Sequence, residues 1–262
     1  MRRRVQARTP FFWVAGFCAY AVCLLVLAPA TLLDAGLAHA SHGRLRIAEA
    51  RGTLWSGTGQ LEILDAAGRG GIERNLSWNF QPQSVLGGQL GFLVDAGQGS
   101  KRFPLTVSIW RIQIVGADFV LPAAALGIAA PRLAVVEPTG DLRVHIATLS
   151  LVDGAILGNG IVEWRAAGSS LTSVAPLGDY ELRFQGSAGG LHASLRTVKG
   201  LLQLEGTGSR GKTGPPLFFA TARVGPEHQL QLAPLLRLIG IERVKGNFTL
   251  QLNQGISREP DI

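Results

Sequence analysis

The sequence predicts an all-β protein, in which a single N-terminal transmembrane helix precedes an extended, curved antiparallel β-sheet domain with short helical turns. Two patterns indicate the sheet. Apolar and polar residues alternate in many short segments, which is typical of strands that bury one face. Glycine, proline or aspartate follows each segment within a few residues, and no long segment after residue 33 has the 3.6-residue period of a helix. Successive strands are therefore expected to pair antiparallel.

An uncharged apolar segment near the N-terminus indicates the helix. No charged residue occurs from Phe11 to Leu33, and these 23 residues would form a helix of about 35 Å, enough to cross a hydrocarbon core of about 30 Å. Four arginines precede the segment within the first eight residues. Because basic flanks remain on the cytoplasmic side, residues 1–10 are predicted to be a cytoplasmic tail and 11–33 the transmembrane helix, with the rest of the chain across the membrane.

A cleaved signal peptide is the alternative interpretation of this segment. Ala38, His39 and Ala40 have the small-x-small form that precedes a cleavage site. The apolar core of a signal peptide usually runs for only about 7–15 residues, which is shorter than the segment here. We therefore expect an uncleaved anchor, with Pro29 kinking the last turn of its helix.

The strands expected after the helix are those with the clearest alternation. They are 45–47, 60–64, 76–80, 142–146, 160–164, 180–184, 202–205 and 248–252. Three other segments, 82–86, 122–126 and 234–239, begin with proline and precede a glycine, which predicts short helical turns. In the last two, a loop, a glycine and a strand follow the turn. The β-rich domain is thus predicted to span 34–254 as two similar halves of about 34–150 and 151–254, followed by a disordered tail over 255–262.

Composition excludes several classes of function. The net charge is +7, from 25 lysines and arginines against 18 acidic residues, and without the four N-terminal arginines it is only +3. No basic run with interleaved aromatic residues occurs, so we expect no nucleic acid as partner. Both cysteines, Cys18 and Cys23, lie in the apolar segment. The rest of the chain therefore has neither a disulfide nor a thiolate with which to bind a metal.

One segment matches the pattern of a phosphate-binding loop. Residues 206–213 read Gly-Thr-Gly-Ser-Arg-Gly-Lys-Thr, but Pro215 and Pro216 follow almost at once and 217–224 has the pattern of a strand. A true phosphate-binding loop opens a helix, which paired prolines disfavour. The segment is therefore predicted to be a turn between two strands, and we expect no nucleotide as partner.

No residue pattern indicates a reaction. The five histidines, at 39, 42, 145, 192 and 228, are dispersed, and the carboxylates stand singly among the strands. The sequence contains neither a nucleophile elbow nor a His-Glu-x-x-His motif. We therefore predict no catalytic residue, no metal site, no cofactor and no enzymatic activity.

Three tryptophans are the most informative side chains. Trp55 lies in the segment Gly-Thr-Leu-Trp-Ser-Gly at 52–57, Trp78 lies in a strand shortly before Pro82, and Trp164 ends another strand. Large aromatic side chains in strands usually pack in a core. The alternative is that some of them line a groove for a partner strand or a lipid chain. The candidate structural or interaction residues are Gly52, Trp55, Gly57, Trp78, Pro82 and Trp164.

The order of these motifs resembles protein N of the type II secretion system. The resemblance covers about residues 1–254 and includes the 52–57 segment, the Trp-x-Phe-x-Pro motif at 78–82, the Gly-x-Val-x-Trp-like segment at 160–164, the leucine-rich 233–240 and the final strand at 246–252. It implies an accessory component of the machinery that exports folded proteins, in the bacterial cell inner membrane with its C-terminal domain in the periplasm. It also implies other secretion-system components as partners, and no catalytic residues.

Two hypotheses follow for function. The first is an anchored periplasmic scaffold that docks on other secretion components, with exposed sheet edges available for strand addition. The second rests on a distant similarity of this family to AsmA-type envelope proteins, and it is a protein that binds or carries lipid in a groove of its β-sheet. The tryptophans and neighbouring leucines distinguish them, because they face a closed core in the first case and an open apolar surface in the second.

Overall fold

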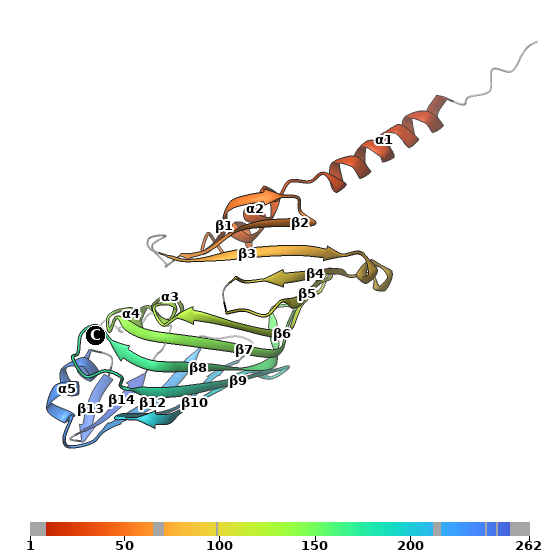
Figure 1. Ribbon diagram of the computed structural model, residues 1–262. Helices are drawn as coiled ribbons and strands as arrows, with labels where there is room; N and C mark the ends of the chain where they lie inside the picture. Colours follow the sequence, from red (N-terminus) through yellow and green to blue (C-terminus); the bar gives the residue numbers. More distant parts are fainter. Residues whose placement is uncertain are drawn as a thin grey trace, which may run out of the picture.

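Fourteen strands form one antiparallel sheet in the computed structural model, which describes residues 9–64, 71–97, 99–211, 216–238, 240–244 and 246–251. The strands follow one another in chain order, except that β14 lies between β12 and β13. Figure 1 shows the sheet as a long, twisted ribbon that starts beside the N-terminal helix. The strands are β1 (Leu45–Gly52), β2 (Ser56–Leu64), β3 (Gly71–Gln81), β4 (Leu90–Asp95), β5 (Phe103–Val107), β6 (Arg111–Pro122), β7 (Pro138–Val152), β8 (Ala155–Ser169), β9 (Gly178–Ser187), β10 (Gly190–Gly200), β11 (Leu202–Arg210), β12 (Leu217–Val224), β13 (Gly240–Val244) and β14 (Asn247–Gln251).

The helices are short, and they either precede the first strand or connect strands of the sheet. In Figure 1, α1 projects from the sheet beside β1 and β2, whereas α3, α4 and α5 lie at the opposite end of the molecule. They are α1 (Thr9–Val26), α2 (Thr31–Ala40), the 3₁₀ helix η1 (Pro82–Gly87), α3 (Ala125–Ala129), α4 (Pro131–Ala134) and α5 (Gln229–Arg237).

The all-β fold and its antiparallel pairing confirm the prediction from alternation. Each expected strand falls within an observed one, apart from the last residue of 248–252, which lies outside the described residues. The hairpins pair in regular register; for example, Leu202 lies opposite Val224 and Ser209 opposite Leu217. Side chains on a strand alternate between the two faces, so this register places the buried Leu202 and Ala220 on one face, whereas Leu217 and Phe219 lie partly exposed on the other.

Irregular pairing bends the longest strands. Between β7 and β8 the register shifts twice, at Thr139/Asp141 and at Ile146/Thr148. Next to the second shift, Gly158 has φ +131°, and a Cβ there would lie 2.0 Å from the carbonyl oxygen of Thr148. Only glycine fits this close approach of two backbones. Such bulges increase the local twist of a sheet, which accounts for the curvature of this part of the molecule.

The single helix predicted for residues 11–33 is wrong in its extent. The helix α1 ends at Val26, and α2 starts at Thr31. Between them, the backbone turns away and pairs with the connection between β1 and β2, where Pro29 forms an isolated bridge to Thr53. Backbone groups that would have continued the helix are thus bonded to the sheet. Across the described residues, the helices all fall short of the length and apolar character that crossing a membrane requires.

For two of the three predicted helical turns, the predicted first residue is wrong. The first is confirmed, since Pro82 begins η1 and Gly88 follows it in the left-handed conformation, with φ 71°. Pro122 instead ends β6, and the helix α3 begins at Ala125. Pro234 lies inside α5, which begins at Gln229 because Leu232, Leu235 and Leu236 form a buried face that spans more than one turn.

Apolar side chains of the sheet gather in two clusters. The first cluster contains buried residues of the N-terminal strands: Ala30, Trp78, Val94, Phe103, Ala117 and Ile146. The second lies between the C-terminal strands and the helices at their end: Val136, Leu177, Leu202, Ala220, Ala222, Leu232, Leu235, Leu236, Phe248 and Leu250. Both clusters belong to one continuous sheet.

Candidate functional site: a helix socket and an apolar cavity

The connection between β1 and β2 forms a socket, made of residues 52–57, that holds the end of α1. The backbone N–H of Leu54 donates to the carbonyl oxygen of Ala28 at 2.8 Å, and the N–H of Ala30 donates to that of Gly52 at 3.2 Å. The indole Nε1–H of Trp55 donates to the carbonyl oxygen of Leu25 at 2.8 Å. The Leu25 carbonyl oxygen also accepts a bond from the Ala28 N–H at 3.3 Å, so Trp55 adds a second bond to a carbonyl in the last turn of α1.

Trp78 packs against this socket. Its side chain is buried, and its Nε1–H donates to the carbonyl oxygen of Thr53 at 3.2 Å. The ring of Trp55 meets Phe80 edge to face at 4.9 Å, and the Phe80 N–H donates to the Trp55 carbonyl oxygen at 2.7 Å. Trp78 and Phe80 of β3 thus fix the position of the connection that receives α1.

Both glycines of the socket are required by its packing. Gly52 has φ +97°, and a Cβ there would lie 2.5 Å from the carbonyl oxygen of Ser56. A Cβ on Gly57 would lie 2.4 Å from the carbonyl oxygen of Arg51 and 2.6 Å from the ring of Trp78. Gly57 therefore makes room for the buried indole, and Gly52 allows the turn.

The helix α2 closes the outer side of β1. The Asp34 carboxylate accepts a bond from the Ile47 N–H at 2.8 Å and forms an ion pair with Arg46 at 3.0 Å. The bonds from Arg46 and from the Ile47 N–H hold the pKa of Asp34 below its usual value. The hydroxyl of Ser41 likewise accepts a bond from the Leu45 N–H at 2.9 Å. Side chains thus bond two amides of this edge strand that would be open to another strand.

The structure brings four of the six candidate residues to one place. Gly52, Trp55 and Gly57 belong to the socket and Trp78 packs against it, whereas Pro82 begins η1. Trp164 lies in the other half of the sheet, where it lines an apolar cavity. Trp55 and Trp78 therefore pack within the fold, whereas Trp164 lines a cavity, which are the two alternatives that the sequence left open.

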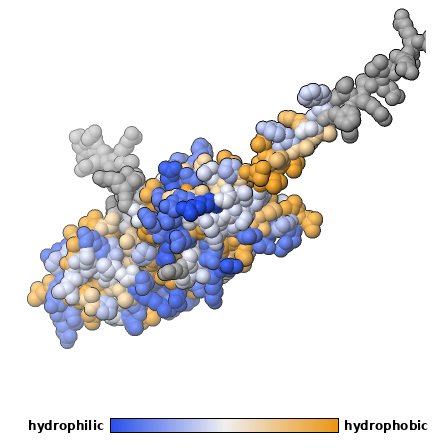
Figure 2. Space-filling view, turned by 45° about the horizontal axis from the view of Figure 1, so that its top comes forward, coloured by the Kyte–Doolittle hydropathy of each residue, from blue (hydrophilic) through white to orange (hydrophobic). Residues whose placement is uncertain are grey.

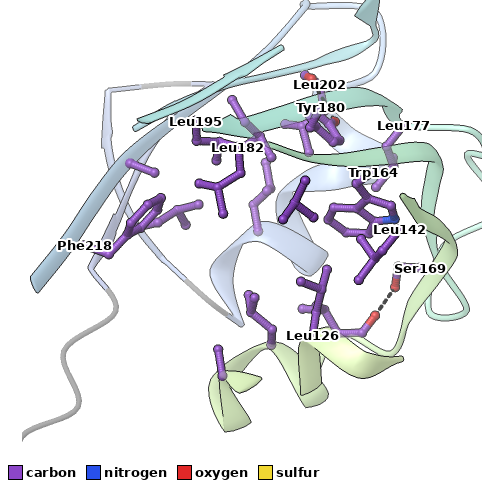
Figure 3. A pocket seen from close by; sticks show the side chains of 18 of the residues that line it. Leu126, Leu142, Trp164, Ser169, Leu177, Tyr180, Leu182, Leu195, Leu202 and Phe218 are labelled. Carbon is purple, nitrogen blue, oxygen red and sulfur yellow. Dashed lines mark hydrogen bonds between the residues drawn. The ribbon is translucent and has the colours of Figure 1, made fainter. Parts of the chain in front are cut away.

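The apolar cavity has a volume of about 570 Å³ and lies between the C-terminal strands and the helices α3, α4 and α5. Figure 3 shows side chains pointing into it from the sheet on one side and from the helices on the other. Its lining consists of Leu126, Ala130, Leu133, Val136, Leu142, Val162, Trp164, Gly168, Ser169, Leu177, Tyr180, Leu182, Leu195, Leu202, Leu204, Pro216, Phe218, Ala220, Leu235, Leu236 and Leu250.

Among the residues that the structure describes, three polar side chains line the cavity, and each is already bonded to the backbone. The Tyr180 hydroxyl donates to the carbonyl oxygen of Leu202 at 2.9 Å, and the Trp164 Nε1–H donates to that of Thr139 at 2.9 Å. The Ser169 hydroxyl donates to the carbonyl oxygen of Val136, as the dashed line in Figure 3 shows. Burial raises the pKa of Tyr180, so its hydroxyl stays protonated as a donor.

Sequence reasoning identified only Trp164 among the cavity residues. The register aligns the others across the sheet, since Leu142 pairs with Trp164, Trp164 with Tyr180, and Leu182 with Leu195. The alternation in the sequence predicts that these positions share a face. It does not indicate that the helices leave space above them, because that depends on the curvature of the sheet.

The opposite face of the same strands carries charge. Glu181 accepts bonds from the Nε–H groups of Arg183 at 2.6 Å and Arg196 at 2.8 Å. These two bonds, first that from Arg196, lower the pKa of Glu181 to about 2. Within the described ranges, no group of three histidine, cysteine, aspartate or glutamate side chains is arranged to hold a metal ion.

The phosphate-binding pattern falls in a hairpin. Gly206 and Arg210 belong to β11, which pairs antiparallel with β12, and β12 spans the predicted strand. Residues 212–215, which include Lys212, lie outside the described part of the chain. The pairing confirms a hairpin of two strands, but the predicted turn is wrong for residues 206–210, which belong to β11.

The fold and the two sites define a β-sheet protein that holds an apolar N-terminal helix at one end and an apolar cavity at the other. The family model described as type II secretion system (T2SS), protein N matches residues 43–251. This match covers most of the chain, which therefore belongs to that family and has its role in type II secretion, as the resemblance of the motifs implied. The search of curated proteins and the search of solved structures each found no match.

Proposed function

We propose that this chain is an accessory scaffold of the type II secretion machinery, anchored in the bacterial inner membrane by its N-terminal helix, with its sheet in the periplasm. The observation that carries the proposal is the socket. Three hydrogen bonds, from Leu54, Ala30 and Trp55, fix the end of α1 to the sheet. A membrane helix joined in this way would hold the sheet at a fixed position relative to the membrane.

The surface of α1 supports the membrane anchor. Every residue from Trp13 to Leu27 is exposed, and most of them are apolar. Figure 2 shows this apolar helix projecting from a body whose visible face is largely hydrophilic near its centre. Exposed apolar side chains on all sides of a helix are costly in water and favourable in hydrocarbon. The arginines before it set the orientation, with the N-terminus in the cytoplasm.

The two edges of the sheet differ in their availability to partners. At the β1 edge, Asp34 and Ser41 accept bonds from backbone amides, and α2 packs against the strand. At the other edge, among the described residues, β13 has a neighbouring strand on one side only; α5 packs against β13 less extensively than α2 packs against β1, and Ile241 is 67% exposed. An edge of this kind favours strand addition. We therefore assign the docking of another secretion component to the β13 edge, through binding and without a chemical step.

Site-specific photo-cross-linking in secreting cells tests the docking. A photoreactive residue at Ile241 should yield an adduct with another secretion component, whereas one at Thr221, an exposed residue on the interior strand β12, should not. The adduct should persist at moderate salt, which screens exposed charges beyond about 8–10 Å. Adducts of equal yield from both positions, or none from Ile241, would contradict docking at this edge.

A reporter fusion tests the anchor separately. Alkaline phosphatase fused after Gly43 should be active, because the enzyme functions only after transfer across the membrane, and a cytoplasmic reporter at the same position should be silent. A mature chain that begins at Ser41 would show that the helix is removed and would rule out the anchor.

A further inference from the structure

The apolar cavity of the C-terminal half is too large to be a packing defect. Protein interiors are packed so closely that voids beyond the size of a water molecule are few. The cavity here has about 570 Å³, which lies within the range of about 300–1,000 Å³ that is typical of ligand-binding pockets. Leucines from β7, β9, β10 and β11 contribute much of its wall.

The chemistry of the wall limits what can occupy the cavity. Its three polar side chains, Trp164, Ser169 and Tyr180, donate their hydrogen bonds to backbone carbonyls. A hydrogen-bond acceptor that entered would lose its bonds to water without finding a free donor on these side chains, which is unfavourable. A hydrocarbon chain has no such bonds to lose, and its burial is favourable.

We propose that this cavity binds one aliphatic chain, of the kind carried by a lipid or an acylated protein, whose polar head remains outside. Trp164 and Tyr180 form one wall against the chain, with ring centroids 5.7 Å apart, and Leu182 and Leu195 form the adjoining wall. Such binding is a further property of the protein beside its scaffold function. It gives the protein a ligand that is independent of its docking edge.

The chain's own segments outside the described residues are poorer occupants. The sequence after Gln251 contains Asn253, Gln254, Ser257, Arg258 and Glu259, and the segment at 212–215 contains a lysine and a threonine. Burial of these groups in an apolar cavity whose donors are already bonded would be costly. The sequence therefore favours a ligand from outside the chain.

Photolabelling with a lipid precursor tests the inference in the intact membrane. Cells that express the full chain are fed a fatty acid bearing a diazirine and an alkyne, irradiated, and the purified chain is digested and mapped by mass spectrometry. We expect adducts on peptides that line the cavity, such as those containing Leu182 or Phe218. The mass of the adduct separates the two sources, because a lipid adds less than a few kilodaltons and an acylated protein adds a polypeptide.

Two matched variants show whether the label enters the cavity. Leu195→Trp fills the space from β10, and Ser194→Trp adds the same ring at the exposed neighbouring position of that strand. Each methylene of the ligand that is buried changes its affinity by about four-fold. If the new ring excludes two or more methylenes, cavity labelling of Leu195→Trp should fall at least about ten-fold. Labelling of Ser194→Trp should stay unchanged. Equal labelling of the two variants would overturn the proposal. Leu182→Phe provides a smaller filling substitution should Leu195→Trp fail to fold.

Two controls distinguish a ligand in the cavity from membrane lipid around α1 and from the chain's own tail. Labelling of α1 reports contact with membrane lipid, so labelled cavity peptides with an unlabelled α1 would support the cavity and contradict the anchor. Labelled α1 with unlabelled cavity peptides would overturn the cavity and leave the anchor intact. A chain truncated after Gln251 should be labelled in the cavity as the full chain is. A several-fold increase on truncation would identify the tail as the native occupant and overturn the proposal.

Discussion

The two halves of the sheet have similar strands, but the apolar face forms a packed core in one half and a cavity in the other. In the N-terminal half, the side chains of Trp78 and Phe103 are buried against Ala30 and Ala117, and aromatic rings fill the space between strands. In the C-terminal half, leucines face the helices α3, α4 and α5 across a cavity of about 570 Å³. The alternation of apolar residues is the same in both. Whether a face becomes a core or a cavity is therefore decided by the segments that cover it.

The closed half should be the more sensitive to loss of a tryptophan. Truncation of the buried Trp78 to alanine leaves a cavity and removes the bond to Thr53, so Trp78→Ala should lower the free energy of unfolding by about 3–5 kcal/mol. Trp164→Ala should cost distinctly less, because its ring already borders open space. Urea unfolding of the two variants measures both changes. Equal losses would mean that the cavity wall is as tightly packed as the core.

Glycine substitutions sharpen the comparison within the closed half. Gly57→Ala would place a Cβ against the Arg51 carbonyl oxygen and the Trp78 ring, at 2.4 and 2.6 Å, and should cost about 1–3 kcal/mol. Gly87→Ala, in η1, meets no atom within 4 Å and should change the stability by less than about 0.5 kcal/mol. Thermal unfolding of both variants tests this difference. A neutral Gly57→Ala would show that the socket can relax around the added methyl group.

A single hydrogen bond in each half provides a finer test. Trp55→Phe keeps the ring beside Phe80 but removes the bond to Leu25, which should cost about 0.5–1.5 kcal/mol. Hydrogen exchange of the Leu54 and Ala30 amides, which hold the end of α1, should become faster. Trp164→Phe removes a similar bond, to Thr139, and should leave those amides unchanged. Faster exchange in both variants would indicate that the two halves open together.

The sequence predicts the strands better than the features that separate the halves. Alternation depends only on neighbours along the chain, and the strand expected at 217–224 is found with those bounds. The break in the N-terminal helix depends on a distant partner, since Pro29 leaves the helix to pair with Thr53. Pro234 lies within α5 because burial of three leucines outweighs its local cost. Trp55, Trp78 and Trp164 stand out in the sequence, but only tertiary contacts show that they serve two different sites.

The smallest expected effects concern one carboxylate in each half. The arginines beside Glu181 lower its pKa to about 2, so its ion pairs stabilise the fold above its usual pKa of 4.5 and cease to do so as the pH falls toward 2. The advantage of the natural chain over Glu181→Gln should therefore be largest at neutral pH and shrink over this window. Arg183 and Arg196 are more than half exposed, so water weakens the pairs and the change stays small.

Asp34→Asn is the counterpart in the N-terminal half. The pKa of Asp34 is also lowered, by Arg46 and the Ile47 amide, so its contribution has the same sign and is lost as the pH falls below its usual value of 3.8. Unlike Glu181, Asp34 joins α2 to β1, so its replacement should also speed hydrogen exchange of the Ile47 amide. Urea midpoints at pH 7, 4 and 3 measure both pH dependences. If the difference in urea midpoint between a variant and the natural chain stays constant with pH, the ionised carboxylate does not account for the lost stability.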